Sequence, residues 1–102
     1  MAEQHRFRYI TKAINDEVEV EIQILLWKLM DLLATERKER MDYFQAFDIN
    51  YDDKQLKITN KQEQPFMEEE FINISGVVFA KNMTVWIIDD IDKQTMLFPS
   101  DY

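Results

Sequence analysis

The hydrophobic positions between residues 18 and 36 repeat at steps of three and four, the spacing of one face of an α-helix. These apolar positions are Val18, Ile22, Leu25, Leu26, Leu29, Leu32 and Leu33. The polar run Asn15–Glu17 comes just before them and carries acidic residues, which suit the positive end of a helix dipole. The pattern therefore predicts a long amphipathic helix from Val18 to about Glu36.

Most of the remaining chain follows the alternating pattern of β-strands. The predicted strands are Phe7–Thr11, Met41–Tyr51, Leu56–Thr59, Met67–Ile74, Thr84–Ile88 and Thr95–Phe98. Thr84–Ile88 has apolar residues on both faces, which indicates a central strand, whereas Pro65 marks a break in pairing or a strand edge. We therefore predict a single α+β domain over residues 1–102, with one long amphipathic helix packed on an antiparallel sheet of five or six strands.

Composition narrows the classes of function. The chain has 102 residues, no cysteine and a formal net charge of −8. The absence of cysteine excludes disulfides and thiolate zinc sites and favours a cytoplasmic protein. The acidic balance argues against direct nucleic-acid binding, which depends on clustered lysine and arginine. The apolar stretch Ile22–Leu33 is interrupted by charged residues and is typical of a core helix, so no membrane span is predicted.

Residues that could carry catalysis are scarce. His5 is the only histidine and lies near the N-terminus, and neither serine lies in a nucleophile motif. Asp89, Asp90 and Asp92 form the best candidate metal site, because hard cations prefer carboxylate oxygens. Aspartates are also common in turns, where their side chains bind local backbone, and we favour that interpretation. We predict no catalytic residue and no cofactor.

One side of the predicted helix is unexpectedly apolar. At about 100° per residue, Val20, Ile24 and Trp27 fall together nearly opposite the core face, with Met30 at the boundary. Two explanations remain open. The N-terminal strand, the segment Glu68–Ile74 or the chain end folds over these residues, or they form a contact surface for a second copy or another protein.

Several strings, in order along nearly the whole chain, are similar to one known family. They are Arg8–Asn15 (RYITKAIN), Leu26–Asp31 (LWKLMD), Asp42–Phe47 (DYFQAF), Trp86–Asp92 (WIIDDID) and Thr95–Phe98 (TMLF). Together they resemble the staphylococcal protein of unknown function family, domain of unknown function 960, of Gram-positive bacteria and their phages. The resemblance implies an α+β fold and a bacterial or phage setting, and it implies no reaction.

These observations favour a non-enzymatic protein-interaction or regulatory domain, acting through a protein partner or through self-association as a homodimer. The first alternative is a metal-dependent enzyme that uses Asp89, Asp90 and Asp92. The second is an acidic nucleic-acid mimic that occupies the basic groove of a partner.

Overall fold

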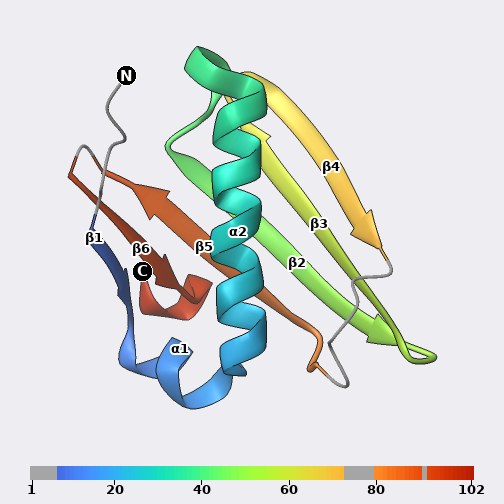
Figure 1. The fold of residues 1–102 in the computed structure, drawn as a ribbon. Helices are drawn as coiled ribbons and strands as arrows, with labels where there is room; N and C mark the ends of the chain where they lie inside the picture. The colour runs from blue at the N-terminus through green and yellow to red at the C-terminus, as the bar shows by residue number, and fades with distance from the viewer. Residues whose placement is uncertain (1–6, 73–79, 91) are drawn as a thin grey trace.

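The computed structural model describes residues 7–72, 80–90 and 92–102, and its main feature is a sheet crossed on one face by a long helix (Figure 1). The elements are β1 (Phe7–Ile10), α1 (Lys12–Glu17), α2 (Val20–Arg37), η1 (Lys38–Arg40), β2 (Phe44–Asp52), β3 (Gln55–Glu63), β4 (Phe66–Ile72), β5 (Met83–Asp89), β6 (Lys93–Leu97) and η2 (Pro99–Asp101). The sheet has six strands in the order β1-β6-β5-β2-β3-β4. The predicted α+β class is confirmed, and β5 (Thr84–Ile88 in the prediction) does lie inside the sheet.

The sheet is mixed, which corrects the predicted antiparallel pairing at one pair of strands. β1 runs parallel to β6, and every other neighbouring pair is antiparallel. Parallel neighbours cannot be joined by a tight turn and need a long connection. Here the connection between β1 and β6 contains nearly the whole chain. The alternation of apolar and polar residues within a strand does not indicate whether a strand so far away in the sequence pairs in parallel or antiparallel.

The helical segment is divided in two, which corrects its predicted start. The Thr11 hydroxyl accepts a hydrogen bond from the Ile14 amide at 3.3 Å and so caps α1 several residues earlier than expected. Val18 then adopts extended backbone and is buried, which ends α1. The run Asn15–Glu17 therefore belongs to the end of α1, and α2 begins at Val20.

The core lies between α2 and the sheet. The buried apolar residues of α2 are Ile22, Leu26, Leu29, Met30 and Leu33. They join a cluster with strand residues that include Phe47, Ile49, Ile58, Val85 and Ile87. Two of the predicted core positions lie on the flank of the helix instead: Leu25 is half-buried and Leu32 is exposed. The helix rests on one sheet only, so its buried stripe is narrower than the apolar pattern suggested.

Two hairpins join β2, β3 and β4, and β3 is longer than predicted. β3 extends to Glu63, beyond the predicted Leu56–Thr59. The prediction ended early because Asn60 and Gln62 are polar, although both face the core. Pro65 lies in the short turn between β3 and β4, where Glu63 pairs with Phe66. β4 confirms the predicted strand from Met67, although Ile74 lies outside the described residues.

Candidate interaction surfaces

The apolar stripe predicted on α2 is only partly exposed. Val20 and Ile24 are 63% and 49% exposed, whereas Trp27 is half-buried. Met30 does not lie on this surface, because it is 1% exposed and belongs to the core cluster. Its position on the helix turns it toward the sheet rather than toward solvent. The exposed part of the stripe is therefore Val20 and Ile24.

Trp27 is covered from within the chain by β1. The Arg8 guanidinium carbon lies 4.8 Å from the centroid of the Trp27 ring, which is the geometry of a cation–π contact. Arg8 also donates to the carboxylate of Asp31 and, through Nε, to Gln94 Oε1 at 2.8 Å. The N-terminal strand therefore covers one residue of the apolar stripe, which agrees with the explanation that another part of the chain folds over it.

A second group of aromatic residues is built around Phe44 and Trp86, which lie on the open face of the sheet, the face turned away from α2. We call Tyr43, Phe44, Trp86 and Tyr102 the aromatic cluster. The Trp86 ring centroid is 4.8 Å from that of Phe44 and 5.8 Å from that of Tyr102. Tyr43 packs against Phe44 at 6.3 Å. Tyr43 and Tyr102 are 64% and 82% exposed, so the cluster presents two tyrosines to solvent.

The open face also carries exposed aromatic side chains on β1 and ion pairs between strands farther along the sheet. Phe7 and Tyr9 of β1 are exposed, with ring centroids 6.5 Å apart, and alternation places them on the same face as Trp86. Across β2, β3 and β4 the same face carries cross-strand ion pairs. Lys61 Nζ lies 3.7 Å from Asp48 Oδ2, and Lys57 Nζ lies 3.7 Å from Glu70 Oε2.

The sequence indicates the position of the aromatic cluster, because β5 has apolar residues on both of its faces. Val85 and Ile87 face the core, so Trp86 and Ile88 must face the other side of the sheet. A strand that is apolar on both sides needs cover on both sides, whereas only one long helix is predicted. The contact between Trp86 and Tyr102 joins residues far apart in sequence and could not be anticipated.

A buried polar cluster lies beneath the C-terminal end of α2. We call Arg37, Gln45, Asn60 and Gln62 the Arg37 cluster; all four are buried. Gln62 Oε1 accepts from Arg37 Nη1 and from Gln45 Nε2, both at 2.8 Å, and Asn60 Nδ2 donates to Gln45 Oε1 at 2.9 Å. Arg37 Nη2 has no hydrogen-bond partner among the described residues and lies 3.9 Å from Glu69 Oε1. These groups bind one another and fix the helix end to the sheet.

The aspartates near the chain end lie in a hairpin turn. The Asp90 amide donates to the Lys93 carbonyl at 2.8 Å, and the Asp89 amide donates to the Tyr43 carbonyl at 2.8 Å. Asp90 and Asp92 are exposed and Asp89 is half-buried. Within residues 7–72, 80–90 and 92–102, no group of three or more histidine, cysteine, aspartate or glutamate side chains is placed to hold a metal ion.

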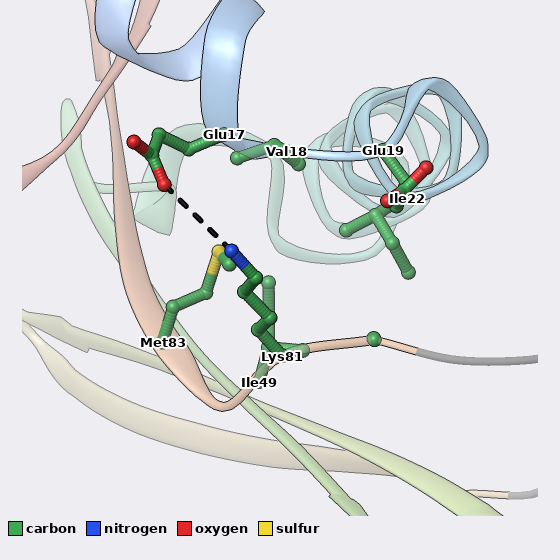
Figure 2. Close-up of a pocket in the computed structure, with 8 residues that line it drawn as sticks. Glu17, Val18, Glu19, Ile22, Ile49, Lys81 and Met83 are labelled. Atoms are coloured by element: carbon green, nitrogen blue, oxygen red, sulfur yellow. Dashed lines mark ion pairs between the residues drawn. The ribbon is translucent and has the colours of Figure 1, made fainter.

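A small pocket lies where α1 meets α2, above the ends of β2 and β5 (Figure 2). Glu17 and Lys81 form an ion pair of 3.9 Å at its mouth, and Ile22, Ile49 and Met83 line its apolar part. Its volume is about 10 Å³, which is near the minimum for one water molecule and far below the roughly 300–1,000 Å³ of ligand sites. This pocket does not accommodate a small-molecule substrate.

The fold and these surfaces define a two-layer α+β domain with a mixed sheet, one helix-covered face and one open aromatic face. The chain belongs to the family described as staphylococcal protein of unknown function, domain of unknown function 960, whose model matches residues 7–101. A solved structure titled "Crystal structure of the protein of unknown function from Enterococcus faecalis" is similar, with a TM-score of 0.83 and 17% identity over 100% of this chain and 98% of that one. That likeness concerns the fold.

Comparison with curated proteins gives no match. In the part of the chain that the structure describes, no helix is both long and apolar enough to cross a membrane.

Proposed function

We propose that this protein is a non-enzymatic interaction domain whose partner protein docks on the aromatic cluster. The observation that carries the proposal is that β5 is apolar on both faces while α2 covers only one of them. Trp86 and Phe44 are half-buried at the centre of this patch, and the exposed rings of Tyr102 and Tyr43 pack against them. Tyrosine and tryptophan are the residue types that most often carry binding energy in protein interfaces.

Charge on the open face supports a protein partner over a nucleic acid. Aromatic side chains on a sheet can stack nucleobases, but such surfaces also carry a positive groove for the phosphates. Here Lys57 and Lys61 are paired with Glu70 and Asp48, and the chain as a whole has a net charge of −8. The same pairing argues against a nucleic-acid mimic, because the acidic groups alternate with lysines instead of forming a continuous anionic surface.

The test compares two double variants that remove exposed apolar groups from different surfaces. Tyr43→Ser/Tyr102→Ser alters the aromatic cluster, and Val20→Ser/Ile24→Ser alters the helix stripe. Each protein is immobilised and exposed to lysate of the native host, and the retained proteins are quantified by mass spectrometry. Circular dichroism confirms that both variants are folded.

We expect a specific protein whose capture falls at least about tenfold with the aromatic-cluster variant, a loss equivalent to about 1.4 kcal/mol, and not with the helix-stripe variant. The proposal is wrong if the aromatic-cluster variant retains the same proteins as the unaltered chain. It is also wrong if capture depends on Val20 and Ile24 alone, or if the protein retains single-stranded DNA at physiological salt.

A further inference from the structure

Among the residues that the structure describes, β1 pairs with β6 on one side, and no strand pairs with the backbone groups of its outer edge. β1 is the terminal strand of the sheet, opposite the β4 edge (Figure 1). The amides of Phe7 and Thr11 donate to the carbonyls of Asp92 and Met96 at 3.4 and 3.1 Å, so the odd-numbered residues face β6. Because backbone groups alternate in direction along a parallel strand, those of Arg8 and Ile10 point outward.

The two edges of the sheet differ in their protection against such pairing. β4 contains the run Glu68–Glu70, and charged residues on an edge strand oppose the approach of a second edge. β1 reads Phe-Arg-Tyr-Ile and has no acidic residue. Its one charge, on Arg8, is balanced by the carboxylate of Asp31.

The net charge of −8 limits the surfaces through which two copies of the chain can associate. Two copies repel each other over most of their surfaces, so contact is favoured where the local charge is close to zero. The edge of β1 meets this condition better than the edge of β4, where three consecutive glutamates have the two cationic partners Arg37 and Lys57.

We propose that two copies of this chain associate through β1, antiparallel and about a two-fold axis, to join their sheets into one. The outward groups of Arg8 in one copy then pair with those of Ile10 in the other, and Tyr9 lies opposite Tyr9 of the second copy. Phe7 and Tyr9 both face the open side, so the exposed rings of the two copies become adjacent. This contact is isologous, as expected for a homodimer.

The dimer is expected to be weak and reversible. An antiparallel pairing centred on Tyr9 gives about four backbone hydrogen bonds. At one hydrogen bond per roughly 100–200 Å², this corresponds to about 400–800 Å² in total, below the roughly 1,600 Å² of a standard interface. Self-association is therefore expected at protein concentrations of about 0.1 mM and above.

The first test uses the absence of cysteine in the natural sequence. Tyr9→Cys places one thiol beside its counterpart, because Cβ atoms in directly opposed antiparallel pairs lie about 4.5–5.5 Å apart, close to what a disulfide needs. Phe66→Cys, at the start of β4, is the matched control, since Tyr9 and Phe66 are 50% and 67% exposed. Mild oxidation is expected to give a covalent dimer of Tyr9→Cys at least about fivefold faster than of Phe66→Cys. Equal rates overturn the proposal.

The second test measures the non-covalent dimer by sedimentation equilibrium. Arg8→Pro removes the outward amide, and an edge strand accepts proline where its N–H faces solvent. Arg8→Ala removes the same side-chain contacts and keeps the amide. We expect the unaltered chain and Arg8→Ala to dimerise and Arg8→Pro to dimerise at least about tenfold more weakly, with circular dichroism confirming the fold. An unaltered chain that stays monomeric at about 1 mM, or an Arg8→Pro variant that dimerises like Arg8→Ala, overturns the proposal.

Discussion

Arg37 Nη1 donates a hydrogen bond of 2.8 Å to Gln62 Oε1, and this contact ties the last residue of α2 to β3 beneath it. Gln62 is the centre of the Arg37 cluster. Its amide nitrogen donates to the carbonyls of Arg40 and Pro65 at 2.8 and 2.9 Å, so one side chain joins the helix end, the following turn and the β3–β4 hairpin. A buried network of this kind is sensitive to the removal of its central acceptor.

Gln62→Leu is expected to destabilise the protein more than Arg37→Met. Loss of Gln62 removes the shorter of the two hydrogen bonds of Arg37 Nη1 and leaves the buried guanidinium with Gln45 Oε1 at 3.4 Å and Glu69 Oε1 at 3.9 Å. It also removes the donor to two backbone carbonyls, and together these losses are expected to cost about 3 kcal/mol of unfolding free energy. Loss of Arg37 leaves Gln62 Oε1 still accepting from Gln45 Nε2, so we expect about 1–2 kcal/mol.

Urea denaturation of both single variants and the double variant tests this ordering. The double variant is expected to lose at least about 1 kcal/mol less than the sum of the singles. Additive losses, or a larger loss for Arg37→Met, contradict the assigned roles.

Lys38→Gly is expected to stabilise the protein. Lys38 follows α2 with φ 55° and ψ −123°, a backbone conformation that favours glycine because it lacks a Cβ atom. A non-glycine residue in such a region costs of order 1–3 kcal/mol, so we expect a gain of about 1 kcal/mol and a rise in Tm of several degrees. Lys38→Ala keeps the Cβ atom and is the control. Equal Tm values for the glycine and alanine variants contradict the prediction.

Two lysine substitutions at positions 24 and 30 of α2 are expected to have opposite outcomes. Ile24→Lys places a charge at an exposed position and is expected to change the unfolding free energy by less than about 0.5 kcal/mol. Met30→Lys places it in the core, with an expected loss of more than about 3 kcal/mol or of the folded state. Thermal unfolding followed by circular dichroism distinguishes them. A folded, stable Met30→Lys would remove Met30 from the core.

The acidic run on β4 is expected to keep this edge from pairing. Glu68→Val/Glu70→Val removes two exposed charges from the strand and leaves Glu69 beside Arg37. The variant is expected to aggregate at concentrations where the natural chain scatters little light, because an uncharged edge strand accepts another strand. Glu21→Val/Glu36→Val makes the same charge change on α2. Equal light scattering by both variants would show that net charge alone controls solubility.

The aspartates of the β5–β6 turn are expected not to bind divalent cations. Asp90 already uses its amide in the hairpin, and both Asp90 and Asp92 have solvated side chains. A metal bound to the folded state raises Tm as its concentration exceeds Kd. We expect no change in Tm with Mg²⁺, Mn²⁺ or Ca²⁺ at about 5 mM. A rise that disappears in Asp90→Ala/Asp92→Ala would support the metal-dependent alternative.

Helices and strands with a regular local pattern of apolar residues could be predicted from the amino-acid sequence. Residues three or four apart in α2, and residues two apart in β2 and β5, face the same core. This periodicity can be seen in the sequence without knowledge of the fold. The same rule places Trp86 on the opposite side of β5 from Val85. Alternation alone is therefore enough to indicate that this strand has a second apolar side, the one that forms the open aromatic face.

Burial and strand direction could not be predicted, because they depend on contacts between residues that are far apart in the sequence. The pattern put Met30 at the edge of the exposed stripe and ended the predicted helix at about Glu36, just before Arg37. Both Met30 and Arg37 are nevertheless buried, because of where α2 meets the sheet. Arg8 covers Trp27 only because β1 pairs in parallel with β6, a contact between opposite ends of the chain. Local periodicity records which side of an element is apolar, whereas burial and strand direction are set by contacts across the whole fold.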